Sequence, residues 1–529
     1  MKYPIGIQTF DKIIEGGFVY VDKTDMIYEL TRGTTFFLGR PRRFGKSLLL
    51  STLESYFLGK KELFKGLAME KLEKEWKQYP VFHLDFGTGN YLNDGTLEEV
   101  IEAHLQEWEN RYGITSPYKD QGLRFAQIMK TAREKTGLGA VVLIDEYDKP
   151  ILDVLDLDYR VEHLGQTVTL EEKHRNIMKS FYATFKSADA DLRFVFLTGV
   201  TKFSQISMFN GFNQPDDISL SENYEALCGI TKDELKQYFA EPIAELAKKY
   251  HCTDEEMLGK LKQKYDGYHF SENMVDIFNP FSLLNALSNK KLIGYWFKSG
   301  TPTYLVRLLT HFDENLNELA GKFYSVPQFD DYKADVEKPL PMIYQSGYLT
   351  IKDYDQDTES YLLDIPNNEV REGLLTVLAN DYLKTKEDSN SWLIQSVHQL
   401  KAGKLAEFMN AMTAFLASIP YSARRKKEER EYERHFHYTF YLLLRMLSCF
   451  LVYHEKETSQ GRADCILETA NDVYIFEFKL NGSADAALQQ IEEKGYAREY
   501  ATDKRQIHLV GVNYSAETGT IEEWKDMQI

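Results

Sequence analysis

Residues 35–58, TFFLGRPRRFGKSLLLSTLESYFL, join a short apolar run to a longer segment through a loop rich in arginine and glycine. The run is typical of a buried strand, and apolar residues after Ser47 recur at three- and four-residue spacing, which predicts an amphipathic helix. Backbone N–H groups at a helix start bind phosphate oxygens, while a lysine adds positive charge and a hydroxyl ligates Mg²⁺. Gly45, Lys46 and Ser47 therefore predict a phosphate-binding loop between a strand and a helix.

The loop differs at one position from the usual GxxxxGK[ST] spacing. Arg40 occupies the place of the first glycine, and Gly39 lies one residue too early. We predict an arginine-rich variant of the loop in which Arg42 and Arg43 contact phosphate, while surface ion pairs with the acidic excess explain both side chains equally well. A lone Gly-Lys-Ser triplet also suits an ordinary helix N-terminus, so a second motif has to decide.

The second motif is AVVLIDEYDKP at residues 140–150, an apolar run that ends in two carboxylates. It fits a neighbouring strand of the same sheet. Burying adjacent unpaired carboxylates is costly unless they serve a cation. We therefore predict that Asp145 holds Mg²⁺ together with Ser47 and that Glu146 polarises an attacking water.

A third apolar run, within LRFVFLTGVTKFSQ at residues 192–205, is expected to lie beside the strand that carries Asp145. Thr198 at its end is a candidate sensor of the γ-phosphate, and capping of the strand end explains the hydroxyl equally well. Short apolar runs alternate with helix-like segments throughout this part of the chain. The alternation predicts an α/β fold in which helices cover a parallel sheet.

Length and charge set the wider organisation. At roughly 100 to 200 residues per domain, 529 residues predict about three domains. Helical periodicity dominates after residue 228, where Thr231 and Glu234 have the spacing of a capping box. We expect domains at residues 1–228, 229–385 and 386–529. The net charge of −18 excludes a uniformly basic surface for nucleic acid, so any phosphate-binding surface is local.

Signals for export and for membranes are weak in this sequence. The four cysteines form no Cys-x-x-Cys pair, which argues against a disulfide framework or a zinc knuckle. The first residues, MKYPIGIQTFDKIIEGG, lack the apolar core of a signal peptide. Residues 436–453 are apolar, but His437 and Arg445 interrupt them, so we expect a buried helix there. The expectation is a cytoplasmic protein without membrane contact.

Near the C-terminus, residues 461–482 read GRADCILETANDVYIFEFKLNG. Two strand-like runs flank Asn471 and Asp472, which predicts a hairpin with these two residues in its turn. This pairing puts Asp464 opposite Lys479 and Ile466 opposite Glu477. Because side chains alternate with a period of two, Asp464, Glu477 and Lys479 then share one face.

Such a patch has two interpretations. Two carboxylates chelate a hard cation such as Mg²⁺ or Mn²⁺, and the lysine orients water for attack on a phosphodiester. An exposed hairpin face with an ion pair worth under about 1 kcal/mol fits the same residues. The basic run RRKK at residues 424–427 could attract phosphates, although the acids that follow favour a solvated helix face.

Eight separated strings together resemble the predicted bacterial AAA-ATPase-like family, whose members commonly carry a C-terminal domain of the PD-(D/E)XK nuclease superfamily. The strings, in order, are FVYVDKTDMIYEL, GRPRRFGKSLLLSTL, VVLIDEYDKPI, LTGVTKFSQ, LCGITKDEL, KYDGYHFSE, NPFSLLNAL and SGTPTYLV. The resemblance implies ATP binding at Gly45, Lys46 and Ser47, with Asp145 and Glu146 as the acidic pair. An arginine in place of the first loop glycine is normal for this family.

For the C-terminal part, the resemblance implies a restriction-endonuclease-like α/β domain in which Asp464, Glu477 and Lys479 form the catalytic set. Glu433, or Glu431 beside it, would be an upstream acid that supports the metal. The proline usual before the aspartate is alanine here, and Tyr496 follows Gln490 by six residues instead of four. Gln490 and Lys494 either contact the nucleic-acid backbone or solvate their helix. Tyr268 and His269 in KYDGYHF and Thr303 in SGTPTYL could contact nucleotide or close a lid, but aromatic packing and turn formation are favoured.

These expectations combine into one functional hypothesis. The protein hydrolyses ATP with Mg²⁺, and its nucleotide state gates a metal-dependent nuclease that cleaves DNA or RNA. A homo-oligomer is compatible with this hypothesis. The alternative is an ATP-dependent switch whose C-terminal domain binds nucleic acid or a protein partner without cleaving.

Overall fold

The computed structural model divides the chain into two compact units, Met1–Val370 and Arg371–Ile529, and each is described by itself. The structure describes residues 1–155, 157–202, 215–297, 319–330, 339–374, 398–400, 402–418, 451–458, 461–469, 471–515 and 517–529. Glu431, Glu433, Thr303 and the run at residues 424–427 lie outside these ranges.

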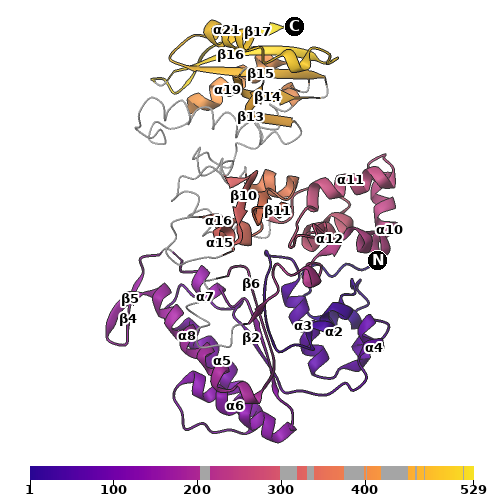
Figure 1. The fold of residues 1–529 in the computed structure, drawn as a ribbon, viewed down its shortest axis with the longest axis vertical. Helices are drawn as coiled ribbons and strands as arrows, with labels where there is room; N and C mark the ends of the chain where they lie inside the picture. Colours follow the sequence, from indigo (N-terminus) through magenta and orange to yellow (C-terminus); the bar gives the residue numbers. More distant parts are fainter. Residues whose placement is uncertain are drawn as a thin grey trace. The chain divides into compact units, whose positions relative to one another are not determined.

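A five-stranded parallel sheet forms the centre of the first unit (Figure 1). Its order is β2 (Val81–Asp85), β3 (Ala140–Asp145), β6 (Leu192–Gly199), β1 (Thr35–Gly39) and β7 (Asp216–Asp217). The predicted parallel α/β fold is confirmed, as is the place of β6 beside β3. One detail of the prediction is wrong, because β3 is not the neighbour of β1. β6 lies between them, and Thr198 therefore stands between the phosphate loop and Asp145.

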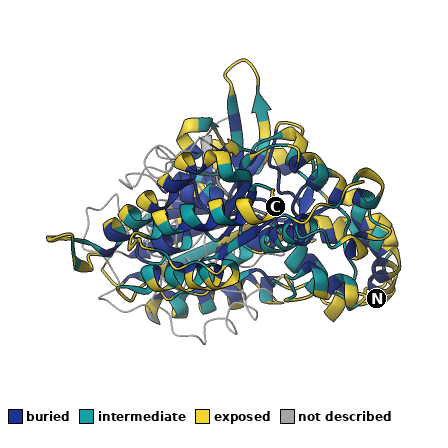
Figure 2. Cartoon of the chain, turned by 90° about the horizontal axis from the view of Figure 1, so that it is seen from below, coloured by how far each residue is buried: buried dark blue, intermediate teal, exposed yellow. Residues whose placement is uncertain are grey.

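Helices cover both sides of this sheet (Figure 1). Every residue of β3 is buried, as expected for a central strand with helices on both faces. Figure 2 shows the same arrangement by burial, with dark blue interior elements and yellow outer helix faces. The helices are α1 (Phe10–Glu15), α2 (Thr24–Leu30), α3 (Lys46–Phe57), α4 (Ala68–Leu72), α5 (Thr96–Tyr112), α6 (Gln121–Thr136), α7 (Lys149–Leu152) and α8 (Leu170–Ser187).

The middle region begins with helices that share one apolar core. They are α10 (Lys232–Lys249), α11 (Asp254–Tyr265) and α12 (Pro280–Asn289). The predicted capping box at the start of α10 is confirmed, since the amide of Thr231 donates to Glu234 (2.8 Å) and the amide of Glu234 donates to Thr231 (3.3 Å).

A small antiparallel sheet, which the sequence did not indicate, completes the middle region. Its strands lie in the order β10, β12, β11, and two short helices, α15 and α16, accompany them. The bounds are β10 (Lys322–Ser325), α15 (Val326–Phe329), α16 (Leu340–Gln345), β11 (Thr350–Asp355) and β12 (Ser360–Asp364).

The second unit contains a five-stranded mixed sheet. The strands follow one another as β13 (Leu451–Thr458), β14 (Gly461–Glu468), β15 (Asp472–Leu480), β16 (Gln506–Ser515) and β17 (Thr520–Gln528). Among the described strands of this unit, β15 and β16 pair in parallel and the other neighbours pair antiparallel; α21 (Ala484–Lys494) connects β15 to β16. Side chains alternate along β15, so that Phe476 packs toward α19 (Leu405–Ser418) and Ile475 shares the other core with α21.

The predicted register of the hairpin is wrong by two positions. Ile466 pairs with Ile475 and not with Glu477, which moves the turn one residue toward the N-terminus. The cause is the side chain of Thr469, whose hydroxyl accepts hydrogen bonds from the amides of Asn471 (3.2 Å) and Asp472 (2.8 Å). A slip of two preserves the face of each residue, so Asp464 and Glu477, which adjoin the pair of Cys465 with Phe476, remain on one face.

The segment at residues 436–453 lies mostly outside the described ranges. Its last residues, from Leu451, begin β13, so a helix through residue 453 is wrong. Within the ranges given above, no helix has the length and the apolar character that a membrane crossing requires.

Candidate functional site

The phosphate loop is the turn between β1 and α3. Gly45 precedes α3 with a φ of 94°, a left-handed conformation that glycine adopts without steric cost. The Lys46 ammonium is buried and donates to the carbonyls of Arg40 (3.0 Å) and Pro41 (3.1 Å). Burial lowers the pKa of Lys46, and the carboxylates across the site act in the opposite direction. Ser47 is the second residue of α3, half-buried at the same end of the sheet.

Opposite the loop, Asp145 ends β3 with only 5% of its surface exposed. Its Oδ1 accepts hydrogen bonds from the hydroxyl of Thr198 (2.7 Å) and from the amide of Glu146 (2.9 Å). Because the carboxyl ends of parallel strands meet at one edge of a sheet, the fold brings together three of the predicted residues, Lys46, Asp145 and Thr198.

Glu146 has a φ of 49°, a strained conformation for a residue with a side chain. Burial raises the pKa of Glu146, the carboxylates of Asp145 and Asp148 add to this, and Lys46 opposes it. Such outliers gather at functional sites, where surrounding contacts hold them. The raised pKa makes the half-buried Glu146 carboxylate more basic than an exposed glutamate, which suits a general base.

Sequence reasoning missed Asp85 as a member of this site. Asp85 ends β2 opposite Asp145 in the sheet register. A Cβ atom on Gly87 would lie 2.8 Å from Asp85 Oδ1 and 3.1 Å from Glu146 Oε2, so both carboxylates face this glycine. The sequence did contain a signal for Asp85, because the apolar run Val81–Asp85 ends in an acid, as the run at residues 140–145 does.

The carboxylates at this edge favour a bound cation. Asp85, Asp145 and Asp148 all raise the pKa of Glu146 electrostatically, and Lys46 lowers it. A magnesium ion ligated by Asp145 and Ser47 would reduce this repulsion, and its phosphate ligands would reach the amides of the loop. The residues thus fit a magnesium nucleotide.

The loop arginines have different environments. Arg43 is exposed, with its guanidinium 5.2 Å from the centroid of the Phe281 ring. The carbonyl of Arg42 accepts a hydrogen bond from the indole of Trp296 (3.1 Å). Arg40, by contrast, is fully buried. It stacks 4.0 Å from the centroid of Phe270 and belongs to the structure of the loop.

The middle region packs directly against the loop. Phe44 contacts Tyr268 edge-on at 4.8 Å between ring centroids, and Tyr268 is 1% exposed. A Cβ atom on Gly347 would lie 2.7 Å from Pro41. His269 lies opposite Asp276 (2.9 Å). The interpretation of Tyr268 and His269 as packing residues therefore agrees with their contacts.

In the second unit, β14 and β15 bring the predicted carboxylates together. Asp464 Oδ2 accepts a hydrogen bond from the amide of Phe478 (2.8 Å). Glu477 is 2% exposed, and the Lys479 ammonium lies 3.6 Å from its Oε1. Gln490 on α21 donates to Glu477 and accepts from Lys479 (2.6 Å), so it holds both side chains. Its spacing in the sequence did not indicate this role.

The electrostatics of this pair also favour a cation. Burial and the nearby Asp464 raise the pKa of Glu477, and Lys479 only partly offsets them. Glu477 Oε2 is buried without a hydrogen-bond partner among the described atoms. A divalent cation between the two carboxylates would satisfy that oxygen. The described ranges contain no group of three or more acidic, histidine or cysteine ligands, and the predicted third acid, Glu433, lies outside them.

Comparisons with known proteins match the two parts of the chain that contain these sites. Residues 4–209 match the family described as predicted AAA-ATPase, and residues 431–524 match the PD-(D/E)XK nuclease superfamily. An uncharacterized protein in the vnfD 5′ region of Azotobacter chroococcum mcd 1 is 36% identical over 529 residues, 98% of each chain. The phosphate loop falls within the first match and the paired carboxylates within the second. The chain therefore belongs to the predicted AAA-ATPase family and carries a C-terminal domain of the PD-(D/E)XK nuclease superfamily.

Proposed function

We propose that the first unit binds ATP with Mg²⁺ and hydrolyses it at the carboxyl ends of β1, β3 and β6. The observation that carries this proposal is the meeting of the Lys46 loop with the bonded pair of Asp145 and Thr198. In this proposal Ser47 and Asp145 hold the metal, and Gly45 leaves the loop amides open to phosphate. Bound Mg²⁺ supplies charge neutralisation at the phosphates.

Several groups of the chain would change partners in this reaction. Lys46 exchanges the carbonyls of Arg40 and Pro41 for phosphate oxygens, which offsets the cost of its burial. Thr198 turns from Asp145 toward the γ-phosphate. Glu146 accepts a hydrogen bond from the attacking water and then its proton, a role that its raised pKa favours. Arg42 and Arg43 remain candidates for contacts with phosphate.

For the second unit we propose cleavage of a phosphodiester in DNA or RNA with Mg²⁺ or Mn²⁺. Asp464 and Glu477 hold the metal with support from Glu433, and Lys479 orients the attacking water. Gln490 keeps the side chains of Glu477 and Lys479 in place. We further propose that the nucleotide state gates this cleavage, in a cytoplasmic protein that can form homo-oligomers.

The ATPase proposal is tested with Lys46→Ala and with the control Lys65→Ala, which removes an exposed lysine. We expect Lys46→Ala to abolish tight ATP binding and hydrolysis, because the loop loses the cation that faces the phosphates. The control should behave as wild type. Hydrolysis by Lys46→Ala at the wild-type rate would contradict the proposal.

The nuclease proposal is tested on panels of DNA and RNA with Mg²⁺ or Mn²⁺, with and without ATP. Asp464→Ala should abolish cleavage, whereas Asp485→Ala, which removes an exposed acid at the start of α21, should not. If wild type cleaves nothing under any of these conditions, the nuclease assignment is wrong and a non-cleaving switch takes its place.

A further inference from the structure

The turn that follows β6 is fixed by a buried carboxylate. Asp148 is 1% exposed, and its Oδ2 accepts hydrogen bonds from the amide of Val200 (2.9 Å) and from the amide (2.7 Å) and hydroxyl (2.8 Å) of Thr201. Three donors to one buried oxygen define a rigid backbone position, because losing any of them would leave a buried polar group unpaired.

Tyr147 fixes the same turn from a second direction. Its amide donates to the carbonyl of Thr198 (3.1 Å), and its hydroxyl donates to the carbonyl of Thr201 (2.7 Å). A Cβ atom on Gly199 would lie 2.6 Å from the Tyr147 ring, so no larger residue fits without a shift. The segment after Asp145 and the turn after Thr198 therefore form one rigid piece.

Lys202 extends this piece toward the middle region. Its amide donates to Gln345 Oε1 (2.8 Å), and its buried ammonium pairs with Asp217 (2.8 Å) and with Asp330. Burial alone would lower the pKa of Lys202, but the two carboxylates outweigh it and raise the pKa. The ammonium is therefore charged, and removing one of its carboxylate partners would weaken the connection.

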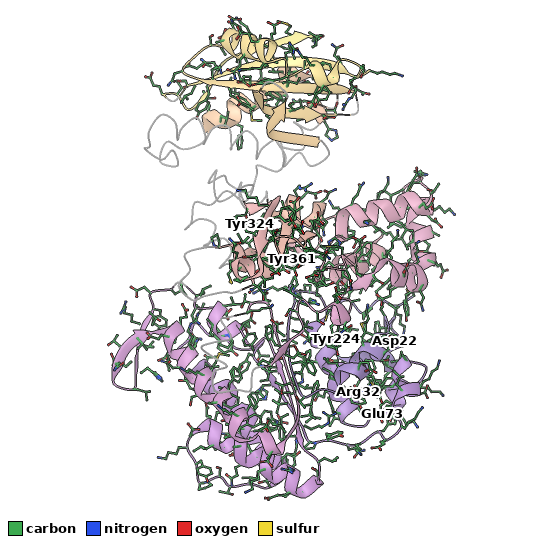
Figure 3. The ribbon with its side chains drawn as sticks, viewed as in Figure 1. Asp22, Arg32, Glu73, Tyr224, Tyr324 and Tyr361 are labelled. Atoms are coloured by element: carbon green, nitrogen blue, oxygen red, sulfur yellow. The ribbon has the colours of Figure 1, made fainter. Side chains whose placement is uncertain are left out.

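Asp330 and Gln345 belong to a packed group of residues around α15 and α16. Gln345 Nε2 donates to the carbonyl of Asp330 (2.7 Å). The ring of Phe329 packs against Tyr344 at 4.6 Å and against Tyr361 of β12 at 5.7 Å, and Figure 3 labels Tyr361 on that strand. A displacement of Lys202 would therefore move α15, α16 and β12 together.

We propose that Lys202 is a positioning residue that couples the nucleotide state at Thr198 to the α15–α16 group of the middle region. This inference rests on the proposed ATP hydrolysis. Thr198 and Asp145 are bonded to each other, and both change partners if a nucleotide and its metal bind. The rigid turn transmits this change to Lys202, and by linkage the position of α16 influences the nucleotide site in return.

The test compares two neutralised carboxylates. Asp330→Asn weakens the Lys202 connection. Its matched control is Glu234→Gln, which weakens the ion pair between Lys23 and Glu234 (2.6 Å) that also joins the first region to the middle region, away from β6. Hydrogen exchange of peptides covering residues 339–350 is measured with and without a non-hydrolysable ATP analogue, together with kcat and KM for ATP.

In the wild type, we expect the analogue to change the exchange of residues 339–350. Asp330→Asn should abolish this difference and lower kcat about tenfold with a smaller change in KM, because a turn released from Asp330 would no longer hold Thr198 in place at the γ-phosphate. Glu234→Gln should retain both the exchange difference and the kcat. Lys202→Arg, which preserves the charge between the two carboxylates, should retain most of the coupling.

If Asp330→Asn fails to fold, Gln345→Leu removes the bond to the Lys202 amide and is expected to give the same loss of coupling. If the wild type hydrolyses ATP but the analogue does not change the hydrogen exchange of residues 339–350, the coupling alone is overturned. Equal behaviour of Asp330→Asn and Glu234→Gln would overturn it as well. A wild type that binds no ATP would overturn the proposed function and the coupling together.

Discussion

At the scale of single residues, Arg40 shows how far a motif position can differ from its expected role. Its guanidinium donates to the carbonyls of Ser219 (2.8 Å) and Tyr224 (3.2 Å), and Figure 3 labels Tyr224. These partners lie 179 and 184 residues away in the sequence. The pattern around Gly45 predicted a phosphate-binding loop. Nothing in that pattern indicated that Arg40 would stabilise the loop from within the core.

Restoring the glycine of the usual motif should therefore weaken the protein. We expect Arg40→Gly to reduce the free energy of unfolding by about 2 to 4 kcal/mol, because the carbonyls of Gly39, Ser219 and Tyr224 lose this donor. Arg43→Gly is the matched control, since Arg43 is exposed with a φ of 68° that glycine adopts more easily. Denaturant unfolding measures both variants. A gain in stability from Arg40→Gly would contradict the structural role.

The buried carboxyl of Asp266 should make the stability of the protein depend on pH. This residue is 0% exposed, and burial raises its pKa to about 7, with Lys262 and Lys352 offsetting the effect only in part. The folded state therefore binds a proton that the unfolded state releases above its ordinary pKa of 3.8. Stability contributed by this group is present at low pH and is lost as the pH rises through about 7.

Asp266→Asn replaces the acid with a neutral group of the same shape. We expect the variant to be more stable than the wild type at pH 8, by at most about 4 kcal/mol, and the advantage to shrink toward pH 4. Thermal unfolding over this pH range measures the difference. An advantage that does not depend on pH would show that the carboxyl is not responsible.

At the scale of secondary structure, the strands with the clearest patterns were predictable. The runs that became β1, β2, β3 and β6 are apolar and short and are separated by helical periodicity. The two-residue β7 and the strands β10 to β12 carry no such pattern. The hairpin was recognisable, but its register depended on the hydroxyl of Thr469, which a turn rule based on Asn471 and Asp472 does not include.

Helix α21 carries a glutamine, Gln490, that we expect to support catalysis. Gln490 is bonded to both Glu477 and Lys479, whereas its neighbour Gln489 bonds the exposed Glu493 (2.7 Å). Residues that orient metal ligands typically contribute 10- to 100-fold to activity. We therefore expect Gln490→Ala to lower metal-dependent cleavage by roughly that factor and Gln489→Ala to leave it unchanged. Equal cleavage rates for the two variants would show that Gln490 does not support the site.

The strands β15, β16 and β17 meet at a buried histidine. His508 lies 3.4 Å from Asp472 and 3.2 Å from Asp526. Burial alone would lower the pKa of His508, but the carboxylates of Asp526 and Asp472 outweigh this effect and raise the pKa. The resulting stability is fully present below the unfolded pKa of 6.5 and is lost as the pH rises through the raised folded value.

Thermal unfolding at several pH values tests this histidine. The second unit of the wild type should lose stability above pH 6.5. His508→Asn should lose much of that dependence, because asparagine does not titrate. If the stability of His508→Asn depends on pH as that of the wild type does, groups other than His508 cause the pH dependence.

At the scale of the whole molecule, each site lies within one compact unit. Lys46, Asp145 and Thr198 belong to Met1–Val370, and Asp464 and Glu477 belong to Arg371–Ile529. The motifs indicated that these residues lie close together, because parallel strands end at one edge of a sheet and side chains alternate along hairpin strands, whereas Asp85 was missed. The contact of Lys202 with Asp330 was not predictable, since it joins residues 128 positions apart without a motif.

Separate cores in the two units predict two unfolding transitions. A ligand that binds only the folded form stabilises its own unit, by about 2.7 kcal/mol at a concentration one hundred times its Kd. ATP with Mg²⁺ should therefore raise the transition that Asp266→Asn also shifts, and Mn²⁺ alone should raise the transition that His508→Asn shifts. Differential scanning calorimetry resolves the two. If ATP raised both transitions and Lys46→Ala abolished both shifts, the units would be thermodynamically linked, as gating requires. If ATP raised neither, the first unit would not bind it.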